Sequence, residues 1–282
     1  RTEARESVAR GRHIRQAGLD FREGDPVLEN GRMLDPAALS LAAAAGHASL
    51  SVVRRPLVAV IATGDELVPP GTLPGPDQIV ASNSFGIAAL VRQDGGQVLD
   101  LGIAPDRRDA IASRVREALA ASADVIVTLG GVSVGTHDLV RDVLAQEGTE
   151  LAFWKIAMRP GKPLMFGRLN SARVLGLPGN PVSSLVCAHL FLRPIVTGLA
   201  GRAYAPDIRT AAITRPMKAN DERRDYVRAI VEGEHDELRA TPFERQDSSM
   251  LTALAAANAL IIREPHAPAL EPGAPCKVLI LR

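Results

Sequence analysis

Between Leu57 and about Gly201, short apolar runs alternate with segments in which apolar residues recur at helical spacing. The apolar runs predict strands at 57–63, 98–103, 125–129, 151–158, 163–169 and 174–177. The helical spacing predicts helices at 82–94, 106–122, from near 137 to before 148, and at 181–199. Alternation of this kind indicates βαβ units. We therefore expect an α/β domain of three layers, with a mostly parallel sheet covered by helices on both faces.

Polar residues at the starts of two of these helices predict how the helices are capped. Asp106 precedes the second helix and Asn180 precedes the last one, and both residue types are favoured at the N-cap. Pro181 follows Asn180 at the first helical position, where its fixed φ suits a helix start.

The pattern differs on either side of this central region. Residues 1–55 form a small leading unit, with a helix from Asp35-Pro36 to Gly46 and a short strand predicted at 49–53. After Asp207, short alternating segments are separated by Gly, Pro and charged turns, which predicts a β-rich domain. The expected division is 1–55, 56–202 and 203–282.

Composition narrows the environment and the classes of partner. A formal net charge of +1 gives no overall attraction to nucleic acid, so an anion site would need a local basic cluster. No apolar run approaches the roughly 20 residues of a membrane span, so we expect no membrane partner. The two cysteines, Cys187 and Cys276, are far apart and without metal-binding spacing, which favours the reducing cytoplasm.

Three predicted strands run directly into glycine-bearing loops with polar or charged residues. These loops are Thr63-Gly64-Asp65-Glu66, Gly130-Gly131-Val132-Ser133-Val134-Gly135 with Asp138, and Leu177-Pro178-Gly179-Asn180-Pro181. The carboxyl ends of parallel strands line the ligand crevice, and free N–H groups of glycine loops suit phosphate. Together they predict a site for a phosphorylated ligand. Each loop taken alone is equally explained as a turn that needs glycine or a capped helix start.

A basic turn follows the fourth predicted strand. Lys155, Arg159 and Lys162 flank Pro160-Gly161, and fixed cations beside glycine loops can hold phosphate or another oxyanion. The alternative is a solvated basic turn.

One further motif has a competing interpretation. Gly131-Val132-Ser133-Val134-Gly135 fits the nucleophile-elbow pattern G-x-S-x-G of esterases. No helix directly follows the serine, and His189 has no supporting context as a partner. We therefore regard the esterase interpretation as a chance match.

Taken together, these loops resemble the molybdopterin molybdenumtransferase family, which includes MoeA and the gephyrin E-domain. The resemblance extends to Pro160-Gly161-Lys162-Pro163, to Leu177–Ser183, and to Arg224–Arg228 and Asn258–Ile261 near the end of the chain. It implies a molybdopterin-binding α/β domain, with a C-terminal β-barrel-like domain after it. It also implies that 1–55 is the remnant of an N-terminal linker or dimerisation domain.

The resemblance implies a molybdenum insertase. Molybdate and adenylylated molybdopterin would be substrates, Mg²⁺ the metal, and molybdenum cofactor and AMP the products. By resemblance, the catalytic positions are Glu66, Asp106, Asp138, Lys155 and Arg159, of which Glu66 and Asp138 would hold the metal. Arg159 stands where a lysine is often found, so its charge is kept but its hydrogen-bond geometry differs.

The same resemblance implies a cofactor-binding set drawn from the glycine loops and the basic turn. Its members are Thr63, Gly64, Asp65, Gly130, Gly131, Ser133, Gly135, Gly161, Lys162, Pro178, Gly179, Asn180, Pro181 and Ser183. The small-molecule substrates would be joined by a second copy of the chain in a homodimer, and by partners from molybdopterin biosynthesis.

The start of the chain departs from the family pattern. Members carry a further N-terminal region ahead of the residue that corresponds to Arg1, so we expect a fragment that binds the pterin but is weakly active or inactive. Two alternatives stay open: a non-catalytic pterin-binding module with the same core, and a scaffold. A Rossmann dehydrogenase is disfavoured because the loop after the first strand lacks G-x-G-x-x-G.

Overall fold

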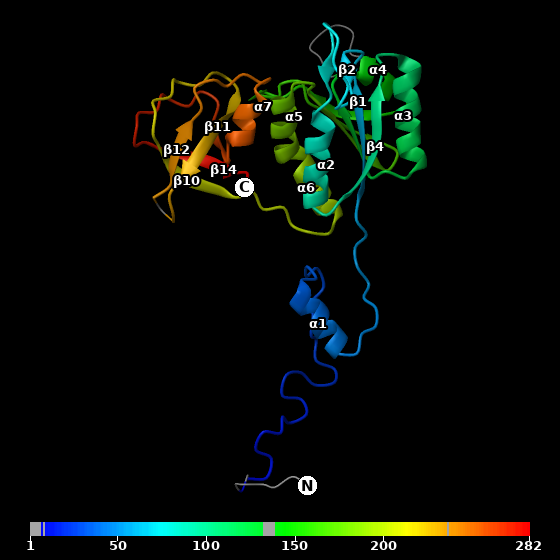
Figure 1. Ribbon diagram of the computed structural model, residues 1–282, viewed down its shortest axis with the longest axis vertical. Helices are drawn as coiled ribbons and strands as arrows, with labels where there is room; N and C mark the ends of the chain where they lie inside the picture. The colour runs from blue at the N-terminus through cyan, green and yellow to red at the C-terminus, as the bar shows by residue number, and fades with distance from the viewer. Residues whose placement is uncertain (1–6, 8, 132–138, 236) are drawn as a thin grey trace. The chain divides into compact units, whose positions relative to one another are not determined.

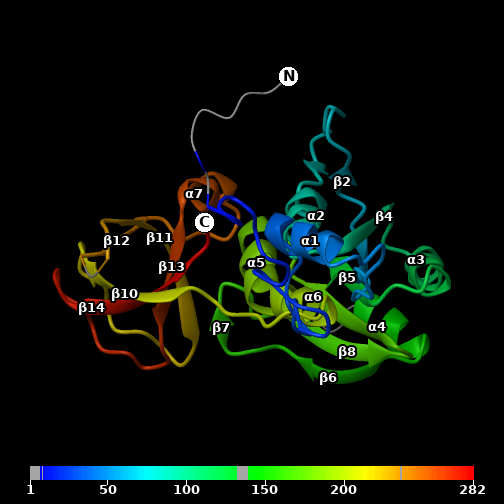
Figure 2. The same cartoon turned by 90° about the horizontal axis from the view of Figure 1, so that it is seen from below.

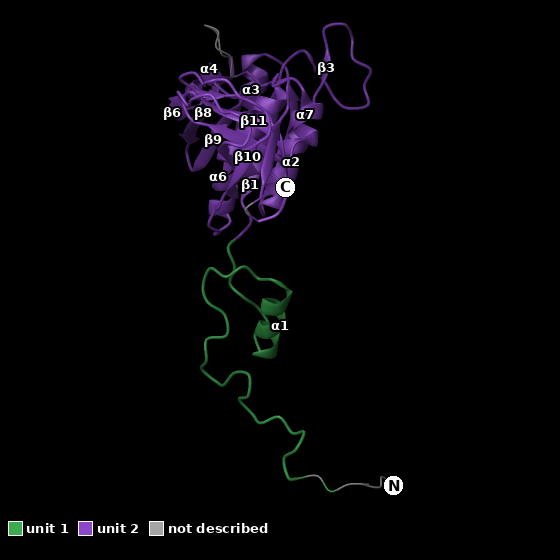
Figure 3. Cartoon of the chain, turned by 90° about the vertical axis from the view of Figure 1, so that its left-hand side faces the viewer, with its two compact units in different colours: residues 1–53 green, residues 54–282 purple. Residues whose placement is uncertain are grey.

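A computed structural model describes residues 7, 9–131, 139–235 and 237–282. The chain divides into two compact units, residues 1–53 and 54–282 (Figure 3). The two larger predicted domains, 56–202 and 203–282, lie together in the second unit.

The first unit contains one helix, α1 (Pro36–Ala44), among its described residues. The Asp35 carboxylate accepts a hydrogen bond of 2.7 Å from the backbone N–H of Ala38, so the predicted cap is confirmed. The strand predicted at 49–53 is wrong, because this segment has no regular structure. Val52 and Val53 are exposed there, and a β-branched segment without a pairing partner gains nothing from strand geometry.

A six-stranded sheet forms the centre of the second unit, in the order β4-β1-β5-β9-β8-β6. The first four strands in this order are parallel, whereas β8 is antiparallel to both of its neighbours. Their bounds are β1 Leu57–Thr63, β4 Gln97–Ala104, β5 Val125–Leu129, β6 Glu150–Trp154, β8 Met165–Leu169 and β9 Ala172–Leu177. The mostly parallel sheet that the sequence predicts is therefore confirmed.

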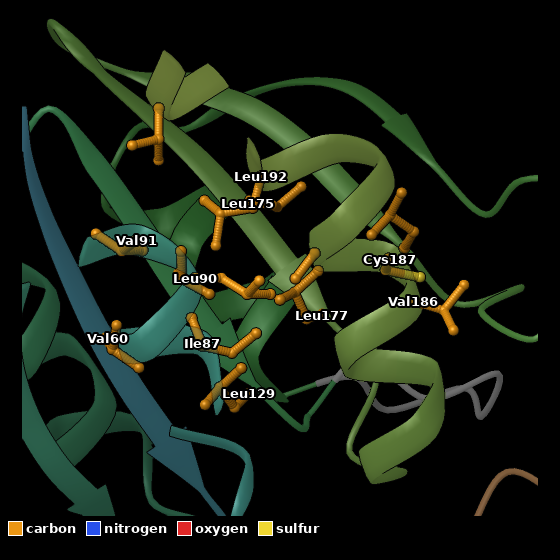
Figure 4. Packing of buried hydrophobic residues seen from close by; sticks show 14 of the residues in the cluster. Val60, Ile87, Leu90, Val91, Leu129, Leu175, Leu177, Val186, Cys187 and Leu192 are labelled. Carbon is orange, nitrogen blue, oxygen red and sulfur yellow. The ribbon is translucent and has the colours of Figure 1, made fainter. Parts of the chain in front are cut away.

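Helices cover both faces of this sheet, as Figures 1 and 2 show. One face packs on α2 (Asn83–Gln93), α5 (Pro181–Cys187) and α6 (Arg193–Leu199), and the other on α3 (Arg108–Ala120) and α4 (Leu139–Gln146). Successive residues of β1 alternate between the two layers: Val60 lies in the first core and Ile61 in the second. Figure 4 shows the first core, where Ile87 and Leu90 of α2 meet Leu175 and Leu177 of β9.

The predicted helix at 181–199 is interrupted by a π-helical turn, Ala188–Leu192, between α5 and α6. In the described part of the chain, only the stretch Pro181–Leu199 is long and apolar enough to cross a membrane, with a mean hydropathy of 1.5. That corrects our expectation that no apolar run approaches this length. Half of the stretch is buried, and Val182, Val186 and Val196 lie in the first core, which is the pattern of a core helix.

The β-rich domain is a closed barrel. Its strands are β10 (Ile208–Ile213), β11 (Arg224–Glu232), β12 (Arg239–Pro242), β13 (Ala259–Arg263) and β14 (Pro275–Ile280), in the order β12-β10-β14-β13-β11. A further pairing between β11 and β12 closes the circle. A short helix, α7 (Leu251–Ala256), follows the β12 loop.

One strand of this second sheet comes from the α/β part of the chain. The sequence predicts a single strand at 151–158, but β6 ends at Trp154 and a separate strand, β7 (Met158–Arg159), pairs in parallel with β11. Lys155 adopts a φ of +77° between them, which turns the chain away from the first sheet. The segment 155–159 therefore links the two domains.

Candidate active site

The ends of β1, β5 and β9 border a cleft of about 700 Å³ at the carboxyl edge of the sheet. A crevice at this edge is where ligands bind in open parallel sheets. Ten of the predicted site residues line it: Thr63, Gly64, Glu66, Asp106, Gly130, Gly131, Pro178, Gly179, Asn180 and Pro181.

The first loop of the cleft folds back on itself after β1. Gly64 has a φ of +145°, and a Cβ on it would lie 2.3 Å from a carboxylate oxygen of Glu66. Only glycine leaves room for the Glu66 side chain in this position. The neighbouring Asp65 accepts a hydrogen bond of 3.0 Å from the backbone N–H of Asp106, which ties this loop to the one after β4.

The second loop comes close to the backbone of the first. Gly130 and Gly131 have φ values of +94° and +66°. A Cβ on Gly130 would lie 2.8 Å from the carbonyl oxygen of Thr63, and one on Gly131 would lie 2.1 Å from Val140. Gly130 therefore allows the close approach of the ends of β1 and β5, and Gly131 allows the loop to pack against α4.

The third loop is held by α2 and by the barrel domain. Asn83 of α2 donates a hydrogen bond of 2.7 Å to the carbonyl oxygen of Gly179. The backbone N–H of Val182 donates to the carbonyl oxygen of Ser248 at 3.1 Å, and the adjacent Ser249 lines the cleft. Asn180 occupies the N-cap position of α5 as predicted, but its side chain makes no capping hydrogen bond.

Asp106 does not cap α3. The helix begins at Arg108, with Arg107 at the N-cap, so the predicted capping role of Asp106 is wrong. Burial raises the pKa of Asp106, and the negative charges of Asp65 and Glu66 raise it further.

The mutual repulsion of these carboxylates is what a bound divalent cation would relieve. Mg²⁺ is commonly held by one or two carboxylates together with substrate phosphates, so Glu66 and Asp106 fit that ion as a partial ligand set. Within the described residues, no group of three or more His, Cys, Asp or Glu side chains could hold a metal ion by itself.

The basic turn lies mostly outside the cleft. Of its residues and their immediate neighbours, only Pro163 lines the cleft wall. The Lys155 ammonium lies over the ring of Trp154, 3.9 Å from the ring centroid, in a cation–π contact. Arg159 extends instead to β11, where its Nε donates to both carboxylate oxygens of Asp225 at 2.9 and 3.0 Å. The carbonyl oxygen of Lys162 closes the turn, because it accepts a hydrogen bond of 3.0 Å from the backbone N–H of Ile156.

Gly161 and Ser183 also lie away from the cleft surface. A Cβ on Gly161 would lie 2.3 Å from the sulfur of Cys187, so this glycine allows the basic turn to pack on α5. Ser183 is buried near the start of the same helix. Three further predicted positions, Ser133, Gly135 and Asp138, lie outside the described residues.

The residue on which the esterase interpretation would rely is placed unfavourably. His189 lies in the π-helical turn and borders a separate cavity near the start of the barrel domain. Burial lowers its pKa to about 4.

Sequence reasoning missed two groups at this site. Asn83 lies at the start of the helix predicted at 82–94, where polar residues are common for capping, so its position in the sequence gives no separate signal of a role at the cleft. Ser249 lies in a loop of the barrel domain, and no sequence pattern joins it to the strand ends of the α/β domain.

Comparison with known proteins gives matches in both domains. Residues 59–198 match the family described as "Probable molybdopterin binding domain", and residues 210–281 match "MoeA C-terminal region (domain IV)". A molybdopterin molybdenumtransferase of Haemophilus influenzae is 36% identical over 255 residues, covering 89% of this chain and 63% of the relative. Molybdopterin molybdenumtransferase 2 of Mycobacterium tuberculosis is 38% identical over 266 residues, covering 91% of this chain and 64% of the relative.

The fold has a counterpart among solved structures. A molybdopterin biosynthesis MoeA protein of Pyrococcus horikosii superimposes with a TM-score of 0.81 at 28% identity, covering 94% of this chain and 64% of that one. The chain thus spans less than two thirds of the length of these relatives. Because both domains match in the same order and the fold agrees, the chain belongs to the MoeA family of molybdopterin molybdenumtransferases.

Proposed function

We propose that the protein to which this chain belongs is a molybdenum insertase. It takes molybdate and adenylylated molybdopterin and releases AMP. Two Mo–S bonds form at the dithiolene, while one molybdate oxygen leaves as water with the two thiol protons. Water is added across the phosphoanhydride, so that one phosphate leaves as AMP and the other stays on the pterin. The relatives named molybdopterin molybdenumtransferase support the general activity, and the cleft supports the phosphorylated substrate.

The observation that carries this proposal is the convergence of three strand-end loops on one cleft. Gly130, Gly131 and Gly179 bring backbone rather than side chains to its wall, which leaves room for a pyrophosphate close to the main chain, although the N–H of Gly130 itself already donates to the carbonyl oxygen of Leu177. Glu66 and Asp106 face the same space with carboxylates. A cleft of about 700 Å³ is of the size that holds one cofactor-sized ligand.

In this proposal each charged residue has a distinct role. Glu66 and Asp106 hold Mg²⁺, together with Asp138 of the loop outside the described residues. Bound Mg²⁺ would offset negative charge on the phosphoanhydride oxygens. Lys155 offsets charge on molybdate or phosphate, and Thr63 and Asn180 orient the substrate at the cleft wall. We retain a catalytic role for Arg159 as a prediction, although its guanidinium is held by Asp225.

The other proposed properties follow from the family resemblance. Gly161, Lys162 and Ser183 would contribute to cofactor binding through the basic turn and α5, and Ser133 and Gly135 through the loop after β5. We also propose a homodimer in the intact protein and a cytoplasmic location.

Ligand binding by this chain tests the proposal. Adenylylated molybdopterin should bind in a Mg²⁺-dependent manner, as measured by calorimetry, and Glu66→Ala should weaken binding and remove the dependence on Mg²⁺. Glu117→Ala is the matched control, because Glu117 lies on the exposed surface of α3 and pairs with Arg114. Equal binding by Glu66→Ala and the parent chain would refute the assigned site.

A second measurement separates an enzyme from a scaffold. In an insertase, release of AMP depends on molybdate, and Asp106→Asn lowers the rate without unfolding the chain. We expect weak turnover by this chain alone. A scaffold of the same fold would release no AMP in any form of the protein, and its pterin binding would survive both substitutions.

A further inference from the structure

A second cavity, of about 360 Å³, lies where the α/β domain meets the barrel domain. Its lining combines Arg193 and Thr197 of α6 with the segment 202–207 and with residues 279–282 at the end of β14. None of the described residues proposed for the molybdenum site lines it. We call it the α6 cavity. Its volume lies near the lower end of the range in which proteins hold small-molecule ligands.

An irregular stretch of helix shapes part of this lining. The π-helical turn Ala188–Leu192 precedes α6, and it includes His189, which borders the α6 cavity. The hydroxyl of Tyr204 donates a hydrogen bond of 3.1 Å to the carbonyl oxygen of His189. Turns of this kind are rare inside helices and are frequent at functional sites. The break in the helix is therefore part of how the cavity is built.

The arginines of the cavity differ in how their charge is compensated. The guanidinium of Arg193 donates to both carboxylate oxygens of Asp94, at 2.8 and 3.0 Å, and Asp94 is only 7% exposed. Asp207 is paired in the same way with Arg209. Arg202 donates to the backbone carbonyl oxygen of Asp94 and forms no ion pair with a described residue. Its positive charge is therefore left uncompensated.

The other ionisable groups of the lining do not remove this charge. The guanidinium of Arg282 donates to the carbonyl oxygens of Ala255 and Ala257, and its charge is offset by the carboxylate that the same residue carries in this chain. Burial lowers the pKa of His189 to about 4, so its imidazole is neutral near pH 7. One positive charge, that of Arg202, remains for a ligand.

A buried hydroxyl in the same lining also lacks a partner. Thr197 is 6% exposed, and its Oγ1 forms no hydrogen bond with a described residue. Of the five described side chains with a buried polar atom in this condition, only Thr197 lines the α6 cavity. Unpaired buried groups of this kind are rare in folded proteins because they are destabilising. Rotation of Thr197 about χ1 would let a ligand in the cavity satisfy the hydroxyl.

The remaining lining suits the apolar part of a ligand. Leu279 and Leu281 come from the end of β14, and the ring of Tyr204 lies 5.9 Å from Cζ of Arg193. An apolar wall with a few polar groups is typical of small-molecule sites. The charge of the ligand follows from Arg202. A carboxylate carries a single negative charge and fits the fork of a guanidinium, whereas a phosphate group at about −1.5 to −2 exceeds what one arginine offsets.

We propose that the α6 cavity is a second binding site, for a small organic carboxylate. Arg202 holds the carboxylate, the hydroxyl of Thr197 donates a hydrogen bond to it, and the apolar body of the ligand packs on Tyr204 and Leu281. The site is separate from the cleft at the strand ends. It does not depend on the proposed insertase activity.

The two tyrosines of the chain give a site-specific assay, because labelling with 3-fluorotyrosine produces only two fluorine NMR signals. Tyr204 lines the α6 cavity, whereas Tyr226 lies in β11 and serves as the internal control. Tyr226→Phe assigns the signals. The probes are sodium benzoate, benzamide, which has the same ring without the charge, and inorganic phosphate, with sodium chloride as the blank at constant ionic strength.

Benzoate should shift the Tyr204 signal saturably and leave the Tyr226 signal unchanged. Benzamide should need at least about a tenfold higher concentration for the same shift, since it lacks the charge-assisted contact. The absence of a saturable shift with benzoate, or an equal response to benzamide or chloride, would overturn the proposal. Saturation by phosphate at a lower concentration than by benzoate would overturn the assignment to a carboxylate.

Variants then test the two residues that hold the carboxylate. Arg202→Gln should raise the half-saturating concentration of benzoate about tenfold or more, and Thr197→Val about three- to tenfold. Arg168→Gln is the matched control, because Arg168 on β8 also donates to a backbone carbonyl oxygen, that of Asn170. Circular dichroism checks folding, and Thr197→Val keeps the shape of the side chain should Arg202→Gln not fold. Full affinity in either folded variant, or an equal loss in Arg168→Gln, would overturn the proposal.

Discussion

The contact between Arg159 and Asp225 gives a prediction that distinguishes two roles for Arg159. The resemblance to molybdenumtransferases predicts a catalytic residue, whereas the structure shows its guanidinium bound to the barrel domain. Asp225 is only 8% exposed and receives hydrogen bonds of 2.9 and 3.0 Å from Nε of Arg159. The two residues are also neighbours in the pairing of β7 with β11. We predict that they stabilise the junction between the domains.

The expected magnitude follows from burial. Removal of one partner of a fully buried ion pair costs about 3–5 kcal/mol, because the other charge is left without compensation. The Arg159 side chain is 47% exposed, so water and the nearby Asp221 partly compensate. We therefore expect Arg159→Ala to lower the free energy of unfolding by about 1–3 kcal/mol. Arg159→Lys keeps the charge but loses the planar fork, and should recover only part of this.

A double-mutant cycle measured by urea unfolding tests the assignment. Arg159→Ala and Asp225→Asn should be coupled by about 1–2 kcal/mol, as expected for residues in direct contact. The control cycle uses Arg209 and Asp207, an ion pair in the same domain with both side chains about half exposed, and its coupling should be close to the experimental error. Additive effects of Arg159→Ala and Asp225→Asn would refute the junction role and favour a purely catalytic one.

Three further predictions concern buried groups near α5. Gly161→Ala should destabilise the chain by about 2–4 kcal/mol in urea unfolding, because its Cβ would meet Cys187. Gly273→Ala is the control, because Gly273 has a similar φ of +90° but open space around it, and this change should cost only about 1–2 kcal/mol. Equal losses in the two variants would show that contact with Cys187 does not contribute. Burial raises the pKa of the Cys187 thiol to about 12, so iodoacetamide at about pH 8 should label it no faster than the chain unfolds. Burial lowers the pKa of His189 from 6.5 to about 4, so protons bind preferentially to the unfolded chain in that window. Stability should fall as the pH is lowered through it, and the fall should be smaller in His189→Gln.

The central fold was predictable because its signals are local. Apolar runs such as 57–63 and 125–129 are buried on both faces and are each followed by a glycine, so their identity as strands needs no knowledge of distant residues. The cap at Asp35 was predictable for the same reason, since its partner is the N–H three residues later. The segment 49–53 shows the limit of such local signals. Its composition favours a strand, but it pairs with no other strand in the described residues and has no regular structure.

The cleft was predictable in part. Parallel strands bring their carboxyl ends to one edge, so the loops after β1, β5 and β9 were expected at that edge, and the strand order β1-β5-β9 makes them neighbours there. Asp106 was identified as a site residue through resemblance, but its local environment was predicted wrongly as a helix cap. Its surroundings depend on Asp65, which is 41 residues away and whose position local patterning does not specify.

The sequence by itself determined the alternation of strands and helices, the sheet they form and the edge at which the glycine loops gather, because periodicity and turn chemistry act over a few residues. Tertiary structure alone decided which residues the cationic side chains of the basic turn contact. The left-handed turn at Lys155 places one cation on Trp154, and the pairing of β7 with β11 carries Arg159 to Asp225, which is 66 residues away. A side chain's partner is set by how the two sheets pack and pair, and nothing in the local order of residues specifies that arrangement.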